Sequence, residues 1–556
     1  MDASDIVMEW VAYSQTKKCQ LSVENLDALD RERLNKKASK MAMTPSSSKS
    51  KSAKRVYDIN SIQDVIDADV ADDIIGAYAT PERTASLKRQ HTTPENISVK
   101  RVMGMSQSPA PAGTFSPASF SPAMATPSQK YSSRKNALES VCSFGAGGRK
   151  KWGRTREEAC SVVPFDSESV LNQKFKYMFQ KLSLKAAILN DQIKDMEVQL
   201  QTQHNIEEFS HLALPAQEQV TVVGRIGCDS NGKLNAKSVV LEGTRDMSAC
   251  RNIPLDLSNV GSYSLFPGQI VALEGINNTG NKMVVKKIHE GVLPPAPEMK
   301  PLSDKKGLSI VVACGPFTTT DNTMFEPLSD LIRYMQRDPP DVCILCGPFL
   351  DYKHPEIEKG NLETTYEEFF STTIAQLSSA ITRNGTQLVV VPSQRDIHHQ
   401  PVYPQPPFTN NKPMVHFVSD PSTINIEGIV LGLTSTDIMF HLGAEEISYS
   451  PGSADRLSRL AEHVITQQNY YPLYPPHEDV NIDYEYFEVH AKMPAMPHVM
   501  ILPSDLRFFI KDVKGCCCIN PGRLTKGQVG GTFARVYINP SEKPVIQNIS
   551  AEVVRI

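Results

Sequence analysis

The sequence of 556 residues has few cysteines, no excess of either charge and no long apolar run. Eleven cysteines over this length fall far below the density of a disulfide-stabilised scaffold, which predicts free thiols in a reducing compartment. No run approaches the roughly 18 apolar residues of a membrane span, and the first residues are acidic where a secretory signal is basic. With 58 Lys and Arg against 62 Asp and Glu, bulk charge does not predict a nucleic-acid-binding protein. We therefore expect an intracellular protein of several domains without a membrane partner.

The first 163 residues differ in composition from the rest of the chain. Apolar residues spaced three to five apart in residues 1–40 predict a short helical segment. Residues 41–163 are rich in Ser, Thr, Pro, Lys and Arg without an apolar period, which predicts a disordered linker. Within it, residues 56–78 mix isoleucines with aspartates. This pattern fits either an acidic amphipathic helix that docks on a partner or a transient helix in a solvated linker.

The hydrophobic period changes from helical to strand-like near residue 210. Apolar residues recur every three or four positions between Ser169 and Phe209, which predicts connecting helices within residues 164–210. In residues 211–293 the period becomes two, and turn residues separate five short strands. Five strands in so short a stretch predict a small closed barrel of the OB-fold type.

Residues 294–556 alternate apolar strands with helical stretches after a proline-rich hinge. The predicted strands are 308–312, 342–345, 388–391, 428–433 and 498–502, and the predicted helices are 328–336, 365–383 and 454–468. Strands that are apolar on both faces indicate sheets covered on both sides, so we expect an α/β domain.

The residues that follow these strands carry the first functional signal, because function in α/β proteins concentrates at the carboxyl ends of strands. Their order and spacing resemble the calcineurin-like phosphoesterases, whose strand ends carry the aspartates, histidines and asparagine of a two-metal site. A two-metal hydrolase needs several oxygen and nitrogen ligands there. The positions that match are Cys314, Pro348, Asp351, Arg395, Asp396, Ser504 and Asp505. Most are not metal ligands, and Arg395 places a cation where a metal ion would lie. We expect an inactivated phosphoesterase sandwich without catalytic residues, metal ligands or cofactor.

Three other motifs have weaker functional interpretations. His398 and His399, with Asp396, could ligate one metal ion, but their proline-rich loop favours a structural or exposed pair. Cys343 and Cys346 have zinc-knuckle spacing inside an apolar strand, and the triplet 516–518 also precedes apolar residues, so buried reduced thiols are expected. The glycine-rich stretch 527–532 lacks the residues of a phosphate-binding loop and predicts tight turns.

Longer strings resemble the B subunits of eukaryotic replicative DNA polymerases, which combine an OB-fold with an inactivated phosphoesterase domain. The strings that carry the resemblance, most similar to the polymerase alpha branch of that family, are 227–235, 263–269, 401–408, 432–437, 441–447, 470–476 and 520–535. The resemblance implies a non-catalytic subunit of the polymerase alpha-primase complex. Its partners would be the C-terminal zinc-binding domain of the catalytic subunit, the primase subunits, other replication factors through the N-terminus, and DNA mainly indirectly. The helical part before the linker is shorter than is usual in the family.

The linker carries candidate regulatory sites. The Ser and Thr residues followed by Pro are Thr44, Thr80, Thr93, Ser108, Ser116, Ser121 and Thr126. A phosphate on such an exposed chain would add about −1.5 to −2 charges and alter docking. The basic run 148–156 is a candidate nuclear localisation signal, in line with a nuclear protein.

Two alternatives remain open at this stage. An active metallophosphoesterase would need Asp351, Asp396, His398 and Asp505 to converge. A single-strand DNA-binding barrel would need exposed aromatic residues interleaved with Lys and Arg, and residues 215–292 offer only Tyr263 and Phe266.

The charge is unevenly distributed along the chain. The linker holds 17 Lys and Arg against 11 Asp and Glu, so it carries a net charge of +6 and the rest of the chain carries −10. This acidic remainder favours protein rather than DNA as its direct partner.

Overall fold

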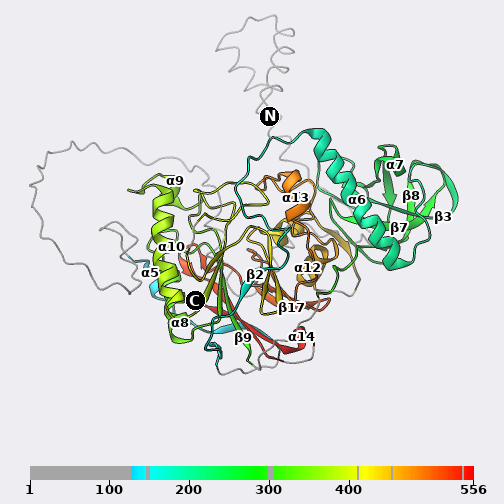
Figure 1. The fold of residues 1–556 in the computed structure, drawn as a ribbon. Helices are drawn as coiled ribbons and strands as arrows, with labels where there is room; N and C mark the ends of the chain where they lie inside the picture. Colours follow the sequence, from blue (N-terminus) through cyan, green and yellow to red (C-terminus); the bar gives the residue numbers. More distant parts are fainter. Residues whose placement is uncertain (1–126, 146–150, 298–305, 410–411, 452–454, 541–543) are drawn as a thin grey trace, which may run out of the picture. The chain divides into compact units, whose positions relative to one another are not determined.

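The computed structural model describes residues 127–145, 151–297, 306–409, 412–451, 455–540 and 544–556 (Figure 1). The predicted N-terminal helices, the 56–78 segment and all seven candidate phosphorylation sites lie outside these residues. Within the described part, no helix is long and apolar enough to cross a membrane.

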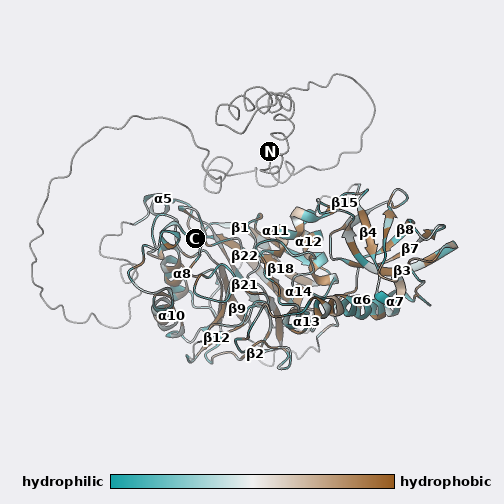
Figure 2. Cartoon of the chain, turned by 90° about the horizontal axis from the view of Figure 1, so that it is seen from above, coloured by the Kyte–Doolittle hydropathy of each residue, from teal (hydrophilic) through white to brown (hydrophobic). Residues whose placement is uncertain are grey.

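A closed five-stranded barrel forms from the residues predicted to be OB-fold strands. Its strands, in spatial order, are β3 (Ala216–Cys228), β4 (Val239–Glu242), β5 (Asn252–Asp256), β8 (Met283–His289) and β7 (Ile270–Asn277). Its interior is filled by aliphatic side chains such as Val222, Leu241 and Leu273, and Figure 2 shows the hydrophobic residues along these strands. Gly224 and Gly275 allow neighbouring strands to approach closely, because an added Cβ would lie within 2.5 Å of a backbone oxygen. The predicted barrel is confirmed.

The rest of the described chain builds two sheets. The seven-stranded sheet has the order β1 (Ser140–Phe144), β22 (Ile549–Arg555), β21 (Thr532–Ile538), β9 (Leu308–Cys314), β10 (Val342–Cys346), β11 (Gln387–Val391) and β12 (Val415–Phe417). The six-stranded sheet has the order β17 (Phe509–Val513), β18 (Cys516–Asn520), β16 (Val499–Ile501), β14 (Ile429–Leu433), β13 (Ser422–Ile426) and β2 (Val162–Pro164). Strands β9, β10, β11 and β12 run parallel.

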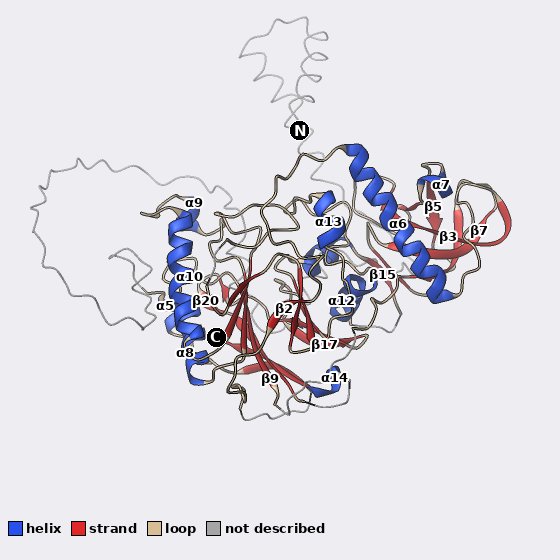
Figure 3. Cartoon of the chain, in the orientation of Figure 1, coloured by secondary structure: helices blue, strands red, loops and turns tan. Residues whose placement is uncertain are grey.

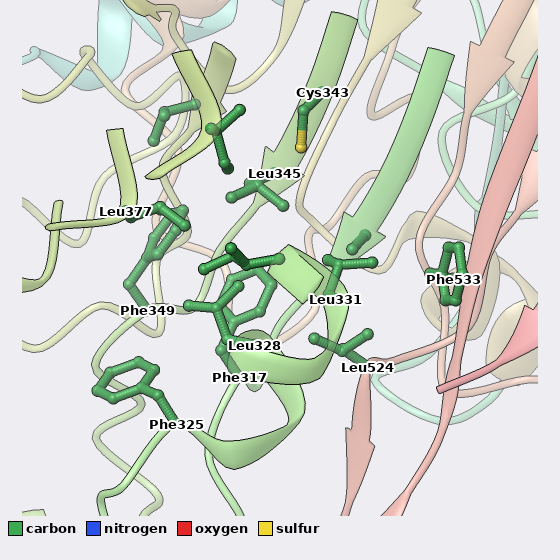
Figure 4. Packing of buried hydrophobic residues seen from close by; sticks show 14 of the residues in the cluster. Phe317, Phe325, Leu328, Leu331, Cys343, Leu345, Phe349, Leu377, Leu524 and Phe533 are labelled. Atoms are coloured by element: carbon green, nitrogen blue, oxygen red, sulfur yellow. The ribbon is translucent and has the colours of Figure 1, made fainter. Parts of the chain in front are cut away.

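The two sheets pack face to face, and helices cover their outer faces. Alternate strand residues point to opposite sides, so Val312 and Ile344 lie in the core between the sheets. Val311 and Leu345 face α8 (Glu326–Arg337) and α10 (Tyr366–Thr382), and Figure 4 shows Leu345 among the helix side chains. The outer face of the six-stranded sheet packs against α11 (Ile438–Glu445), α12 (Arg456–Thr466) and α13 (Tyr484–His490). Figure 3 shows helices on both sides of the strands. The predicted α/β domain with covered sheets is confirmed.

Local sequence explains where the helices begin. At α10, the Oγ1 of Thr365 accepts a hydrogen bond from the backbone N–H of Glu368 at 3.2 Å, and two glutamates occupy the first turn. At α12, Asp455 accepts from the N–H of Ser458 at 3.2 Å. The short helices are α5 (Gln129–Ser132), α7 (Arg245–Ser248), α9 (Pro355–Glu358) and α14 (Val545–Asn548).

Two short ribbons complete the fold. Strand β6 (Tyr263–Leu265) of the barrel region pairs antiparallel with β15 (Ile447–Tyr449) of the α/β region. Strands β19 (Thr525–Lys526) and β20 (Val529–Gly530) form a hairpin whose turn contains Gly527 at a φ of 59°. The glycine-rich stretch 527–532 therefore makes tight turns between strands, as predicted.

The predicted end of the disordered linker at residue 163 is wrong. Strand β1 pairs with β22, and β2 pairs with β13, so described residues before 164 belong to both sheets. Part of the candidate localisation signal is also packed into the fold: Trp152 is buried beneath the guanidinium of Arg535, and Arg156 pairs with Glu427 at 3.3 Å. Those residues are not a free basic peptide.

The predicted connecting helices begin later than the sequence pattern indicates. Helix α6 (Leu182–His204) covers only the second half of the range, and residues 169–181 are not helical. Tertiary contacts override the helical pattern there: Met178 has a φ of 65° and donates its backbone N–H to Asp483 at 3.2 Å. The ring of Phe175 stacks on Tyr486 with centroids 3.6 Å apart.

Candidate functional site at the carboxyl ends of the strands

The parallel strands β9, β10 and β11 bring the predicted site residues to one edge of the sheet. Cys314 and Cys346 are register partners, and the turns after both strands contact each other. The N–H of Gly315 donates to the carbonyl of Cys346 at 2.8 Å, and that of Gly347 donates to Val391 at 2.9 Å. Glycine is needed at both turns, since a Cβ would lie 2.1 Å from the Pro348 carbonyl or 2.5 Å from the Asp396 carboxylate. The turns are therefore packed against each other.

Arg395 and Asp351 form an ion pair at this edge. The Arg395 Nε lies 3.1 Å from the Asp351 Oδ1, and its terminal nitrogen contacts the other carboxylate oxygen, so the pair is bidentate. Burial alone would lower the pKa of Arg395, but Asp351 raises it above its ordinary value. Arg395 thus lies beside Asp351 at the strand ends, and its guanidinium engages both carboxylate oxygens.

Asp396 shapes the loops rather than facing an open site. Its carboxylate accepts hydrogen bonds from the backbone N–H groups of Phe349 at 2.5 Å, Leu350 at 2.9 Å and Ser393 at 3.0 Å. It is 2% exposed, and burial raises its pKa to about 7 despite these hydrogen bonds. The carboxylate satisfies buried backbone donors that would otherwise be unpaired.

A second guanidinium, which the sequence interpretation missed, occupies the neighbouring strand ends. Arg523, 4% exposed, bonds Asp505 at 2.9 Å and Asp437 at 3.3 Å, and Asp437 also accepts the backbone N–H of Asp505 at 2.7 Å. Partial desolvation by the surrounding protein would raise the pKa of Asp505, whose side chain is 58% exposed, but Arg523 lowers it to about 2. Asp437 follows β14 and Arg523 follows β18, so the strand-end rule could have found both residues.

The remaining predicted positions are structural. Ser504 donates its N–H to Asn520 at 3.0 Å, and its hydroxyl accepts from Leu506 at 3.1 Å. Cys314 is fully buried, and its carbonyl accepts from the N–H of Leu524 at 2.7 Å. Pro348 supplies a carbonyl to the packed turn beside Gly315.

Asp420 was also missed by the sequence interpretation. This fully buried carboxylate accepts hydrogen bonds from the Thr434, Ser435 and Thr436 hydroxyls at 2.7 to 2.8 Å and from the Ser435 N–H at 2.9 Å. The run of three hydroxyl residues after β14, residues 434–436, is the feature of the sequence that could have indicated a buried acceptor. Burial raises the pKa of Asp420 and these hydrogen bonds oppose that rise, and together they fix the loop after β14.

No group of three His, Cys, Asp or Glu side chains within the described ranges has the geometry to hold a metal ion. An active metallophosphoesterase would need Asp351, Asp396, His398 and Asp505, and each of these side chains makes other contacts in the structure. His398 stacks on Phe408 with centroids 5.3 Å apart, and burial lowers its pKa to about 3. His399 contacts the Pro406 carbonyl at 2.6 Å. These contacts fit the structural interpretation of the histidine pair.

The cysteine motifs lie in sheet interiors. Cys343 and Cys346 are on β10, and the triplet 516–518 begins β18; all five side chains are fully buried and free. Burial raises the pKa of the Cys343 and Cys517 thiols well above the ordinary value. The prediction of buried reduced thiols is confirmed.

The two aromatic residues that could have served a DNA-binding barrel are packed against the α/β part. Phe266 is fully buried and contacts His463 edge-on at 4.9 Å between centroids, and Tyr263 lies on β6 beside β15. At the same junction the Ser264 hydroxyl bonds Glu446 at 2.6 Å and His463 at 2.7 Å. These contacts join the barrel to the α/β part, and they leave the Phe266 ring inaccessible to a stacking base.

A cleft of about 130 Å³ lies beside this junction, between α6, the barrel and the loops before α13. Its lining includes Arg225, Tyr474 and Tyr484. The buried Arg225 lies over the Tyr474 ring at 5.6 Å and donates to the Leu189 carbonyl at 2.5 Å. The lining of the cleft therefore does not include the strand-end residues. Arg225, which lies on β3, links the barrel to α6 through its hydrogen bond to Leu189.

Comparisons with known proteins identify the family to which the chain belongs. Three family models match the chain. They describe the B subunit of DNA polymerases alpha and epsilon over residues 310–511, the OB domain of the DNA polymerase alpha B subunit over 186–291, and the N-terminal domain of the same B subunit over 1–36.

The chain is also similar to full-length relatives. It is 45% identical to the DNA polymerase alpha B subunit of Mus musculus, covering 99% of this chain and 93% of the mouse protein. The Drosophila melanogaster protein of that name is 31% identical over 97% of this chain and 91% of its own length. The Schizosaccharomyces pombe protein of that name is 34% identical over 66% of this chain and 68% of its own length. The chain therefore belongs to the family of DNA polymerase alpha B subunits.

Proposed function

We propose that this chain is the non-catalytic accessory subunit of the DNA polymerase alpha-primase complex. It would scaffold the catalytic subunit and help to recruit the complex for replication initiation and primer synthesis. One observation supports the non-catalytic part: at the strand ends, Arg395 pairs with Asp351 and Arg523 pairs with Asp505, so these aspartates are engaged by guanidinium groups. A permanent guanidinium neutralises the carboxylates but cannot activate water as a metal ion does.

The two-sheet architecture supports an inactivated calcineurin-like phosphoesterase sandwich. Its parallel strands deliver their carboxyl ends to one edge, as that fold requires, and the residues there are cross-linked by hydrogen bonds. The barrel is joined to this sandwich through β6, β15 and the Ser264 contacts. The two joined domains would together bind the C-terminal zinc-binding domain of the catalytic subunit.

The remaining partners follow from family membership. Residues 1–36 match the N-terminal model of the family, so we assign them the recruitment of other replication factors. We also propose that the chain contacts the primase subunits, that it is nuclear, and that its seven Ser-Pro and Thr-Pro sites are phosphorylated. Mass spectrometry of the chain isolated from dividing cells tests the phosphorylation sites.

A hydrolysis assay separates this proposal from an active metallophosphoesterase. The purified chain with added Mn²⁺ is expected to hydrolyse bis(p-nitrophenyl) phosphate no faster than buffer with Mn²⁺, because the strand-end carboxylates are engaged. Manganese-dependent turnover that Asp396→Ala and Asp505→Ala both abolish, with circular dichroism showing that the variants fold, would establish an enzyme instead.

A further inference from the structure

The segment before α6 combines positive charge with aromatic rings. Residues 174–185 contain four lysines and three aromatic residues, and no Asp or Glu occurs between residues 169 and 190. We call residues 174–185 the lysine-aromatic strip. Up to Lys181 it is not helical, and Lys and aromatic residues alternate from Lys174 to Tyr177.

The rings of the strip continue a stack on α13. Phe175 stacks on Tyr486 at an interplanar angle of 18°, and Tyr486 stacks on His490 with centroids 6.0 Å apart. Tyr177 packs edge-on against Phe175 at 6.3 Å. Beyond this column, Phe179 is 80% exposed and Leu182 85% exposed. Met178 at 49% and Leu184 at 37% are exposed in the same segment, and such a group of exposed apolar side chains is typical of an interaction site.

The lysines are available to an anionic partner. Lys174, Lys176 and Lys181 are exposed, and no carboxylate in the described part of the chain pairs with them. Lys185 lies over the Tyr484 ring at 4.6 Å. Acidic groups on α13 and α6 lie nearby. Asp483 bonds the strip backbone, Glu485 is exposed, and Lys492 lies 4.0 Å from Glu488 and 2.7 Å from Asp195.

We propose that the lysine-aromatic strip binds single-stranded nucleic acid. Lysines along an extended segment match the repeating phosphates, and Phe179 and Tyr177 offer ring surfaces on which bases stack. An acidic peptide would satisfy the lysines but not the ring faces, whereas each nucleotide presents both a phosphate and a base. The site lies outside the barrel region, where Phe266 is fully buried and Tyr263 lies on β6 beside β15. The inference does not depend on the proposed accessory function.

Oligonucleotide binding by the full chain tests the strip. A labelled oligo(dT) of about 20 nucleotides, followed by fluorescence anisotropy, is expected to bind with a steep salt dependence. Phe179→Ala is expected to weaken binding about fivefold or more, the loss of one stacked base. Replacing Lys174, Lys176 and Lys181 with Gln is expected to reduce the slope of log K against log salt by about 2.

Matched controls separate the strip from general charge and exposure. Lys233→Gln with Lys237→Gln removes exposed lysines from a barrel loop, and Phe440→Ala removes a 41% exposed ring from α11; both should bind as the unmodified chain does. The proposal is overturned if the strip variants bind oligo(dT) like these controls, or if the unmodified chain does not bind it. Strip variants that lose the catalytic subunit but keep unchanged oligo(dT) binding would also overturn it, assigning the strip to a protein.

Discussion

Replacing Arg523 with alanine is expected to lower the free energy of unfolding by about 3 to 5 kcal/mol, because it leaves a buried aspartate without its counter-charge. Arg523 is 4% exposed and the Asp437 side chain 13% exposed, so this pair is shielded from bulk water. Asp505, whose side chain is 58% exposed, contributes less to this loss. Urea unfolding followed by circular dichroism measures the change.

Two further variants identify the cause of that loss. Arg337→Ala removes a 62% exposed guanidinium paired with Asp338, and we expect a change within about 0.5 kcal/mol. Adding Asp437→Asn to Arg523→Ala removes the orphaned charge and is expected to recover part of the stability. If Arg523→Ala unfolds at the same urea concentration as Arg337→Ala, the buried pair is not what holds these strand ends.

Glu446→Gln is expected to lower the stability of the barrel junction by about 3 kcal/mol at pH 7. Burial alone would raise the pKa of Glu446, but His463 and Arg459 lower it to about 2. A carboxyl whose folded pKa lies below its unfolded value of about 4.3 stabilises the fold above that value. This stability is lost as the pH falls from about 4.5 towards 2, so the variant and the unmodified chain should converge there.

The pH dependence makes this prediction specific. Thermal unfolding at pH 7, 4 and 3 should show a gap between Glu446→Gln and the unmodified chain that narrows with acid. Glu478→Gln, at an exposed position, should show no such gap at any pH. A gap that stays constant down to pH 3 would mean that the carboxylate charge is not what joins Ser264, His463 and Arg459.

The barrel strands and the strands β9, β10, β11, β14 and β16 were predictable from their own sequence patterns. The barrel strands alternate, and the central strands are apolar throughout, so local sequence defines them. Strands β21 and β22, which pair with β9 and with each other, were not among the predicted strands. Strands β1 and β2 were not predictable, because short segments in a Ser- and Arg-rich stretch become strands only by pairing with β22 and β13. The start of α6 was missed for the same reason, since Phe175 and Met178 are held by α13 and its N-cap.

The candidate site was partly predictable. Asp351, Arg395, Asp396 and Asp505 were singled out from the sequence, and the structure places each of them in the loops that follow the strands. The pairing of Arg523 with Asp437, 86 residues apart, depends on two strands of the six-stranded sheet ending at the same edge. Sequence order alone does not give that proximity.

The association with the catalytic subunit of DNA polymerase alpha tests the central claim most directly. The full chain, co-expressed with the full catalytic subunit and analysed by size-exclusion chromatography with light scattering, is expected to elute as one species with the mass of one copy of each. Elution of the chain at its own mass, separate from a folded and active catalytic subunit, would contradict the account.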